Sequence, residues 1–335
     1  MIRVLALLGL AAVGTVVVWK GSIWLEDAAD RIATGYGVPG VVQGAVIAAV
    51  GSSMPELVSV LLATLLHGEF ELGIGAVVGS AVFNLLVIPG VVVLLAGSME
   101  TSRSLVYKEA LFYMLAVAVL LLTFSLAVIY NPVGGDGPIQ GTVTRPLALF
   151  PIALYALYVF TQYLDTTEHD SSSGVGVGIR TWLVFAAGLA LIVVGVEALV
   201  RAAIGFGSVF DTPTFLWGMV VVAAGSSVPD AFVSVAAARA GRHDVSLANV
   251  LGSNTFDLLV AVPLGVVVAG ALTITFEHVV PMMGFLVLAT VVFFAVARTE
   301  MLLSRREATL LLALYGLFVV WILAESIGAT TVVPT

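Results

Sequence analysis

The sequence predicts an all-α polytopic membrane protein, with ten transmembrane helices arranged as two inverted repeats of five helices. Composition is the first observation behind this prediction, because 60% of the 335 residues are hydrophobic and only 10% are charged, against about 25% in soluble domains. The second is the length of the apolar runs, which reach the ~20 residues that a helix needs to cross a bilayer. The third is a polar motif that occurs once in each half of the chain.

The apolar runs fill the chain from end to end, and several contain glycine, proline or polar residues in mid-run, which predicts tilted or broken helices. A polar, serine-rich stretch at 165–174 has the composition of a flexible linker. We therefore divide the chain into a first half, 1–164, a short linker, 165–177, and a second half, 178–335. The predicted helices cover about residues 2–33, 39–66, 71–97, 105–129, 146–164, 178–205, 213–240, 245–272, 278–298 and 306–327.

The distribution of lysine and arginine predicts the orientation of these helices. In the ten-helix arrangement one side of the membrane carries three basic residues, Arg3, Arg145 and Arg201, and the other side carries the remaining ten of the 13. Cytoplasmic loops carry the excess of basic residues. We therefore expect an N-out/C-out orientation with the 165–177 linker in the cytoplasm, in a multi-pass protein of the cell membrane. We interpret the first run as a transmembrane helix and not as a signal peptide, because no small-residue cleavage site ends it before Lys20.

Composition also excludes several classes of function. The chain has no cysteine, which excludes disulfides, thiolate catalysis and cysteine-based metal sites. The net charge is −8, with a pI near 4.9, which disfavours nucleic acid as a partner. The lipid bilayer is the expected surrounding, and no obligate protein partner is evident.

The repeated motif reads GSSMPE at 51–56 and GSSVPD at 225–230. About 25 residues later the first copy continues as VVGSAVFNLL and the second as LGSNTFDLL. The copies occupy about residues 39–97 and 213–272, across the second and third helices of each half. Because five is an odd number, the two halves have opposite topologies, and we expect the two motifs to meet near the membrane midplane.

The motif combines a helix break with oxygen-bearing side chains. Pro55 has no N–H to donate to the Gly51 carbonyl, so the helix should bend there and release carbonyl groups, and the second copy repeats this arrangement. Three acids at membrane depth, Glu56, Asp230 and Asp257, carry up to three negative charges that cations or protons must neutralise. Carboxylate, amide, hydroxyl and carbonyl oxygens are ligands of hard cations such as Ca²⁺, Na⁺ and K⁺. Three Na⁺ ions would balance the charge, and so would one Ca²⁺ with one K⁺ or one proton.

These two copies resemble the α-repeats of the sodium/calcium exchanger family, within the cation/Ca²⁺ exchanger superfamily. Their residues are most similar to those of its potassium-dependent branch. The resemblance implies a transporter, not an enzyme, that exchanges Na⁺ for Ca²⁺ by alternating access. It implies Glu56 and Asp230 as the central Ca²⁺ ligands, and it associates Asp257 with K⁺ while leaving K⁺ co-transport open. The other implied Na⁺/Ca²⁺ ligands are Ser52, Ser53, Ser80, Asn84, Ser226, Ser227, Ser253 and the carbonyl groups of Ala49 and Ala223.

Other functions remain open at this stage. A Ca²⁺/H⁺ antiporter would use the same fold and load protons on the carboxylates. An intramembrane hydrolase could use Asp230 and Asp257 as an acid dyad, although this would leave the Glu56 motif unexplained, and a passive channel would show ion flux without a counter-ion. Outside the motif, we interpret Glu26 with Arg31 and Glu197 with Arg201 as structural groups near helix ends. We interpret His67, Glu69 and Glu71 as members of a solvated loop.

Overall fold

The computed structural model is a bundle of helices, and it describes all residues except 38–48, 102–104, 136, 165–176, 327 and 331–335. Three short segments within the bundle have the wider π-helical turn and carry the label η. The helical elements are α1 (Ile2–Gly35), α3 (Ala49–Ser52), α4 (Met54–His67), α5 (Phe70–Ala96), η2 (Leu105–Glu109), α6 (Ala110–Tyr130), α7 (Arg145–Leu164), α8 (Ile179–Phe210), α9 (Thr214–Trp217), η3 (Gly218–Val222), α10 (Ala223–Arg239), α11 (His243–Phe256), η4 (Asp257–Ala261), α12 (Val262–Ala269), α13 (Phe276–Arg298) and α14 (Arg305–Ser326).

The helices agree with a polytopic membrane protein. Within the described residues, eight helices or helix runs are long and apolar enough to cross a membrane, and α4 is a shorter apolar helix of 14 residues. Each predicted apolar segment coincides with helix, apart from the first part of the 39–66 segment, which lies outside the described residues. The number of ten crossings and the N-out/C-out orientation stay predictions.

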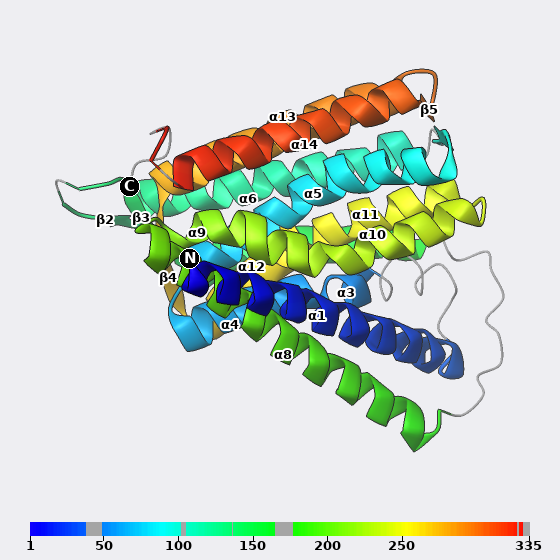
Figure 1. Ribbon diagram of the computed structural model, residues 1–335, viewed down its shortest axis with the longest axis horizontal. Coiled ribbons are helices and arrows are strands. Elements are labelled where there is room, and N and C mark those ends of the chain that lie inside the picture. Colours follow the sequence, from blue (N-terminus) through cyan, green and yellow to red (C-terminus); the bar gives the residue numbers. More distant parts are fainter. Residues whose placement is uncertain (38–48, 102–104, 136, 165–176, 327, 331–335) are drawn as a thin grey trace.

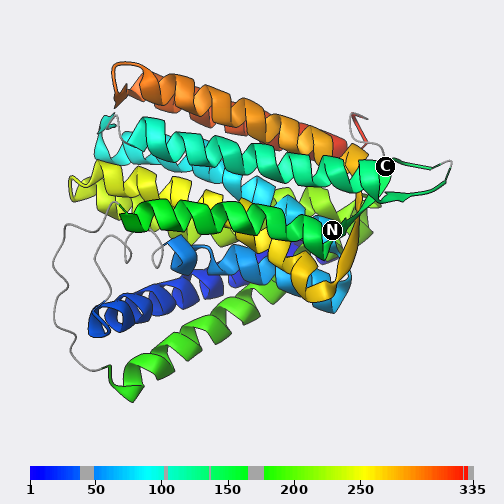
Figure 2. The same cartoon turned by 180° about the vertical axis from the view of Figure 1, so that it is seen from behind.

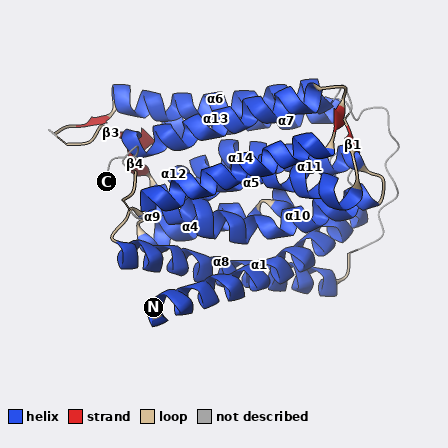
Figure 3. Ribbon diagram, turned by 45° about the horizontal axis from the view of Figure 1, so that its top comes forward, coloured by secondary structure: helices blue, strands red, loops and turns tan. Residues whose placement is uncertain are grey.

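The helices that carry the repeated motif lie at the centre of the bundle. In the most apolar stretch of α5, 78% of the residues are buried, and in that of α11, η4 and α12 the share is 83%. In the corresponding stretch of α1 only 11% of the residues are buried. The pair of α1 and α8 lies at one side of the bundle, and α6 and α13 lie at the opposite side (Figures 1 and 3). Central helices without an amphipathic pattern are expected to be buried on every side. The motif is therefore shielded from lipid by the surrounding helices.

The α1–α8 pair is joined by a seam of glycines at seven-residue spacing. Gly14 faces Gly195 and Gly21 faces Gly188, so the helices run antiparallel. A Cβ atom on Gly21 would lie only 2.8 Å from the Gly188 carbonyl oxygen. Small residues let helix backbones approach closely inside a membrane, and these glycines hold α1 and α8 together over much of their length.

Short strands join loops that are far apart in sequence. The stretch 131–145, between the predicted helices 105–129 and 146–164, contains β2 (Pro132–Val133) and β3 (Gln140–Thr144), and β3 pairs with β4 (Ala271–Thr275) in antiparallel register. The expected helix over 245–272 therefore ends at Ala269, because its last residues join this sheet. A second strand pair lies at the other end of the bundle, between β1 (Met99–Glu100) and β5 (Leu302–Leu303).

Basic residues gather at one end of the bundle. The end opposite the three-stranded sheet holds the last turns of α10 and α13 and the first turns of α8 and α14 (Figure 2). We call this the basic end; its basic residues include Arg180, Arg239, Arg242, Arg298, Arg305 and Arg306. Lys20 is an exception to the expected pattern, because α1 continues past it to Gly35 and leaves it in mid-helix.

Candidate cation-binding site

The two copies of the motif have different backbones. In the first copy the helix breaks at Ser53, between α3 and α4, and Pro55 stands in the first turn of α4. The predicted bend is therefore confirmed in this copy. In the second copy α10 runs unbroken through Pro229, so the predicted second break is wrong. The π-helical segment η3 directly precedes α10. A wider turn of this kind is an irregularity that a helix can contain without being interrupted.

Close helix packing brings the two copies together. A Cβ atom on Gly79 of α5 would lie 2.3 Å from the Met219 carbonyl oxygen and 2.8 Å from the Ala223 side chain. Only glycine allows α5 to approach η3 and α10 at this distance. One residue beyond Gly79, the Ser80 hydroxyl lies 2.7 Å from the Ser227 hydroxyl. The residues expected from two distant stretches of sequence therefore share one site.

Hydrogen bonds join the acids of both copies to α5. The Ser80 hydroxyl lies 3.1 Å from Oε1 of Glu56, to which it can donate. The Asn84 amide donates to Oδ2 of Asp230 at 3.3 Å and to Oδ1 of Asn254 at 3.0 Å. Ser80 and Asn84 are four residues apart and share one face of α5. This face thus connects the Glu56 half of the site with the Asp230 half.

The site is buried and holds oxygen atoms without partners. Glu56, Asp230 and Asp257 are each 1% exposed. Oε2 of Glu56, Oδ1 of Asp230 and both carboxylate oxygens of Asp257 are buried and make no hydrogen bond to any residue that the structure describes, and neither does Oδ1 of Asn84. Buried polar atoms are nearly always satisfied in proteins, and buried charges are paired or coordinate metals. The buried side chains of Glu56, Ser80, Asn84, Asp230 and Asp257 form one polar group, which we call the polar track. Five of its oxygen atoms lack a partner, and a group of bound cations would supply one.

The remaining predicted ligands lie around the same track. Ser52 approaches Asp230, and Ser53 approaches Asp257 while its hydroxyl donates to the Ser253 carbonyl at 3.3 Å. The hydroxyls of Ser226 and Ser253 donate to carbonyls of their own helices, those of Ala223 and Val250. Ala49 begins α3, and only its backbone is described. In the described part of the chain, no three acidic or histidine side chains converge as a compact metal cluster, so the carboxylates are spread along the track with serine and asparagine between them.

Two residues near the site were not among the predicted ligands. Asn254 connects Asn84 to the Ala81 carbonyl, to which it donates at 3.2 Å. Glu26 of α1 lies beside Gly51, and its Oε1 is buried without a hydrogen-bond partner. Of the two structural roles considered for Glu26, snorkelling or an end-of-helix pair with Arg31, the pair is not formed, since Arg31 makes no ion pair within the described residues. An acid within a transmembrane run is by default a functional candidate, and this signal in the sequence would have found Glu26.

Pairs of polar side chains link neighbouring elements at the end of the bundle that carries the three-stranded sheet. Glu197 binds Arg201 at 2.6 Å, as predicted, and it also contacts His67 at 3.1 Å. Glu71 contacts His278 at 2.8 Å. Glu69 accepts a hydrogen bond from Thr214 at 2.6 Å. The interpretation of His67, Glu69 and Glu71 as a solvated loop is therefore wrong, because all three link α4 and α5 to neighbouring elements.

A bundle of membrane-length helices around a buried, oxygen-lined acidic site defines a membrane cation transporter. The chain belongs to the sodium/calcium exchanger protein family, whose model matches residues 6–164 and 180–324. This family consists of transporters, not enzymes. The resemblance read from the two motif copies is confirmed.

Curated relatives match most of the chain at moderate identity. An uncharacterised membrane protein of Methanocaldococcus jannaschii is 27% identical over 92% of this chain and 95% of its own length. The sodium/calcium exchanger MaX1 of Methanosarcina acetivorans is 26% identical over 72% of this chain and 77% of its own length. A short stretch, 16% of this chain and 11% of the relative, is 42% identical to the human sodium/potassium/calcium exchanger 5.

Solved structures confirm the fold. The sodium-calcium exchanger NCX_Mj, soaked with 10 mM Na⁺ and no Ca²⁺, matches with a TM-score of 0.62 over 95% of this chain and 99% of the other, at 21% identity. The same exchanger soaked with 2.5 mM Na⁺ and 1 mM Sr²⁺ matches with a TM-score of 0.63 over 94% of this chain and 97% of the other, at 23% identity. The polytopic helical architecture predicted from the sequence is the architecture of these exchangers.

Proposed function

We propose that the chain is a secondary active antiporter that exchanges Na⁺ for Ca²⁺ across the membrane by alternating access. One observation carries the proposal: three carboxylates buried in the middle of the bundle hold four oxygen atoms without any partner. Such charges are too costly to leave uncompensated at membrane depth. Bound cations supply the compensation, and the relatives named as sodium/calcium exchangers indicate which cations these are.

We further propose that the twelve predicted residues form the ion sites, with Glu56 and Asp230 central to Ca²⁺ binding. Burial, orphaned oxygens and the shared contacts of Ser80 and Asn84 support this assignment. Carboxylate, hydroxyl and carbonyl oxygens suit Ca²⁺ and Na⁺, and no described side chain of the site supplies the imidazole that a zinc site favours. Asp257, whose two oxygens lack partners, is the group at which a K⁺ requirement is best tested.

The two-half division of the chain also remains our proposal, with halves 1–164 and 178–335 around the 165–177 linker. The antiparallel register of α1 and α8, the first helices of the two halves, supports it. Opposite directions of equivalent helices are what an inverted repeat produces. A location in the cell membrane is supported by a 26% identical inner membrane protein of Escherichia coli, YrbG.

A Ca²⁺/H⁺ antiporter is the alternative within the same fold. It would neutralise the carboxylates with protons instead of Na⁺. The hydroxyls of Ser52, Ser53, Ser226 and Ser227 favour Na⁺, because neutral oxygens of this kind can complete the coordination shell of a hard cation. The described histidines lie at helix ends, where they form no relay into the site.

Flux measurements in proteoliposomes test the proposal. Vesicles loaded with Na⁺ are diluted into Na⁺-free buffer containing ⁴⁵Ca²⁺, with and without K⁺, and a second set carries a pH gradient alone. We expect uptake that requires internal Na⁺, and Glu56→Gln vesicles serve as the matched negative control. Uptake driven only by the pH gradient would move the chain to Ca²⁺/H⁺ exchange. Ca²⁺ flux that needs no counter-ion would indicate a channel and refute antiport.

A further inference from the structure

The α1–α8 seam opens into a pocket at the basic end of the bundle. The seven-residue spacing that pairs Gly14 with Gly195 and Gly21 with Gly188 next brings Ala28 opposite Thr181. Here side chains replace the glycines, so the helices can no longer touch through their backbones. Figures 1 and 2 show the two helices diverging toward this end. The divergence leaves a cavity of about 340 Å³ between them.

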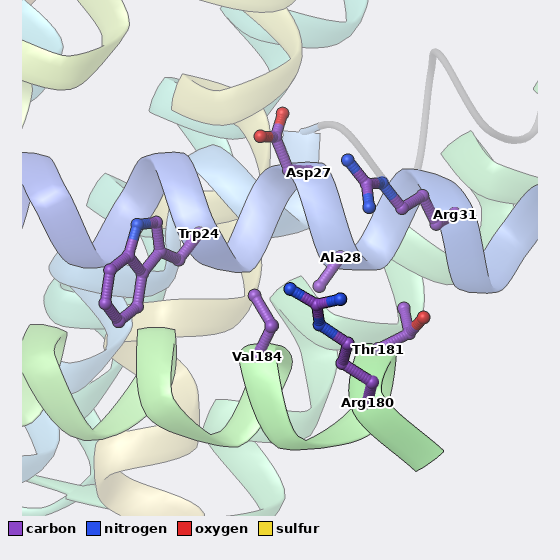
Figure 4. A pocket seen from close by; sticks show the side chains of 7 residues that line it. All are labelled: Trp24, Asp27, Ala28, Arg31, Arg180, Thr181 and Val184. Carbon is purple, nitrogen blue, oxygen red and sulfur yellow. The ribbon is translucent and has the colours of Figure 1, made fainter. Parts of the chain in front are cut away.

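Two arginines from different helices line this pocket. Arg31 comes from the last turns of α1 and Arg180 from the first turn of α8. In Figure 4 the Arg180 side chain extends from α8 toward α1, whereas the Asp27 carboxylate points away from α8. Neither arginine forms an ion pair or side-chain hydrogen bond with any residue that the structure describes. With Asp27 counted, the lining carries a net charge of +1.

The start of α8 adds to this positive potential. Its N-cap residue, Gly178, provides no side-chain cap, so the first backbone N–H groups of the helix are not satisfied by a side chain. A helix N-terminus favours negative charge and readily binds phosphate. Thr181 lines the same pocket (Figure 4). A guanidinium group binds phosphate oxygens through paired N–H donors.

We propose that this pocket binds the phosphate of an anionic phospholipid, held between Arg31 of α1 and Arg180 of α8. Both residues belong to terminal turns of membrane-length helices, the depth at which headgroups lie. A phosphodiester carries one negative charge, which balances the net charge of the lining. Basic pockets between transmembrane helices bind lipid headgroups in this way. The bound phosphate would join the two helices where the glycine seam no longer does. This site is separate from the proposed ion sites and does not depend on which cations the chain exchanges.

Native mass spectrometry of the purified full chain tests the proposal with phosphatidylglycerol and phosphatidylcholine of identical acyl chains. We expect tighter retention of phosphatidylglycerol, and a loss of at least about tenfold in its affinity in the Arg31→Gln/Arg180→Gln variant. The matched control is Arg305→Gln/Arg306→Gln, which removes the same charge from the same end but outside the pocket, and we expect it to bind like the wild type. Asp27→Asn removes the opposing carboxylate and should tighten binding.

Three results would overturn the proposal. Equal retention of both lipids by the wild type would show that the pocket does not select an anionic phosphate. Equal losses in the pocket and control variants would indicate general surface electrostatics. In the third result, inorganic phosphate at millimolar concentration displaces the lipid and raises the melting temperature of the protein by as much as the lipid does. That result would assign the pocket to free phosphate. Should the double variant fail to fold, Arg180→Gln and Asp27→Asn must still shift affinity in opposite directions. Because binding is measured without flux, a negative result here leaves the exchange proposal untouched.

Discussion

Replacement of Asp257 by asparagine is expected to stabilise the cation-free protein. Asp257 is 1% exposed, and neither of its carboxylate oxygens has a hydrogen-bond partner. An unpaired buried charge costs several kcal/mol, whereas a neutral amide that lacks its partners costs roughly 1–3 kcal/mol. The Asp257→Asn substitution should therefore raise the free energy of unfolding by on the order of 2 kcal/mol. For a chain of 335 residues, whose unfolding entropy is about 0.7 kcal/mol/K, that corresponds to a rise of roughly 3 °C in melting temperature.

Cations should reverse this advantage. A ligand present at 100 times its Kd stabilises the folded state by about 2.7 kcal/mol, and the variant should gain less because it has lost a charged ligand. The assay is thermal unfolding followed by the fluorescence of the five tryptophans, first in chelator with a bulky organic cation and then in Na⁺ or Ca²⁺. Asp211→Asn is the matched control, since Asp211 is exposed at the end of α8 in a left-handed conformation that asparagine tolerates. Equal melting of wild type and Asp257→Asn without cations would refute the idea of an uncompensated charge, and equal gains with cations would remove Asp257 from the site.

Three further outcomes follow from the geometry of the site. Glu56→Gln and Asp230→Asn should each abolish Na⁺-driven Ca²⁺ uptake in a protein that still elutes as one folded species; wild-type uptake would exclude that residue as a ligand. Ser80→Ala removes the hydroxyl between Glu56 and Ser227 and should weaken the apparent Ca²⁺ affinity about tenfold, read from the Ca²⁺ dependence of initial uptake; an unchanged affinity would contradict this role. Gly79→Ala places a Cβ atom 2.3 Å from a backbone oxygen and should destabilise the fold by about 1–3 kcal/mol; an unchanged melting temperature would show that α5 can move away from η3.

The site was predictable from sequence because its chemistry is local. A proline that follows two serines and precedes an acid is unusual in a membrane helix, so each motif copy signals its own role. The meeting of Ser80 with Ser227 follows once the copies are placed in opposite topologies. Glu26 was interpreted as a structural residue because it lies toward the end of its predicted helix, and only the packing of α1 against Gly51 brings it to the site.

The parts that sequence did not predict depend on tertiary contacts. Strand β3 is a five-residue segment whose partner β4 lies some 130 residues later in the sequence. Such short strands exist because a neighbour supplies the hydrogen bonds. Proline alone did not decide whether a motif helix breaks: the same Ser-Ser-x-Pro sequence breaks before α4 and stays helical in α10, where η3 precedes it.

Coupled exchange follows from the same two features that define the molecule: an acidic site at the centre and a closely packed helix pair beside it. With its ions removed, the track leaves three buried acids without compensation, and any movement that closes the site off from water in that state is opposed by several kcal/mol per charge. With three Na⁺, or with one Ca²⁺ and one further positive charge, the net charge falls to zero and the opposition disappears. The α1–α8 pair lies beside the site and is joined through glycine backbones, so we expect its two helices to shift together. Under the proposed function, the charge balance of Glu56, Asp230 and Asp257 therefore decides when that shift can occur, and obligatory exchange requires no separate gate.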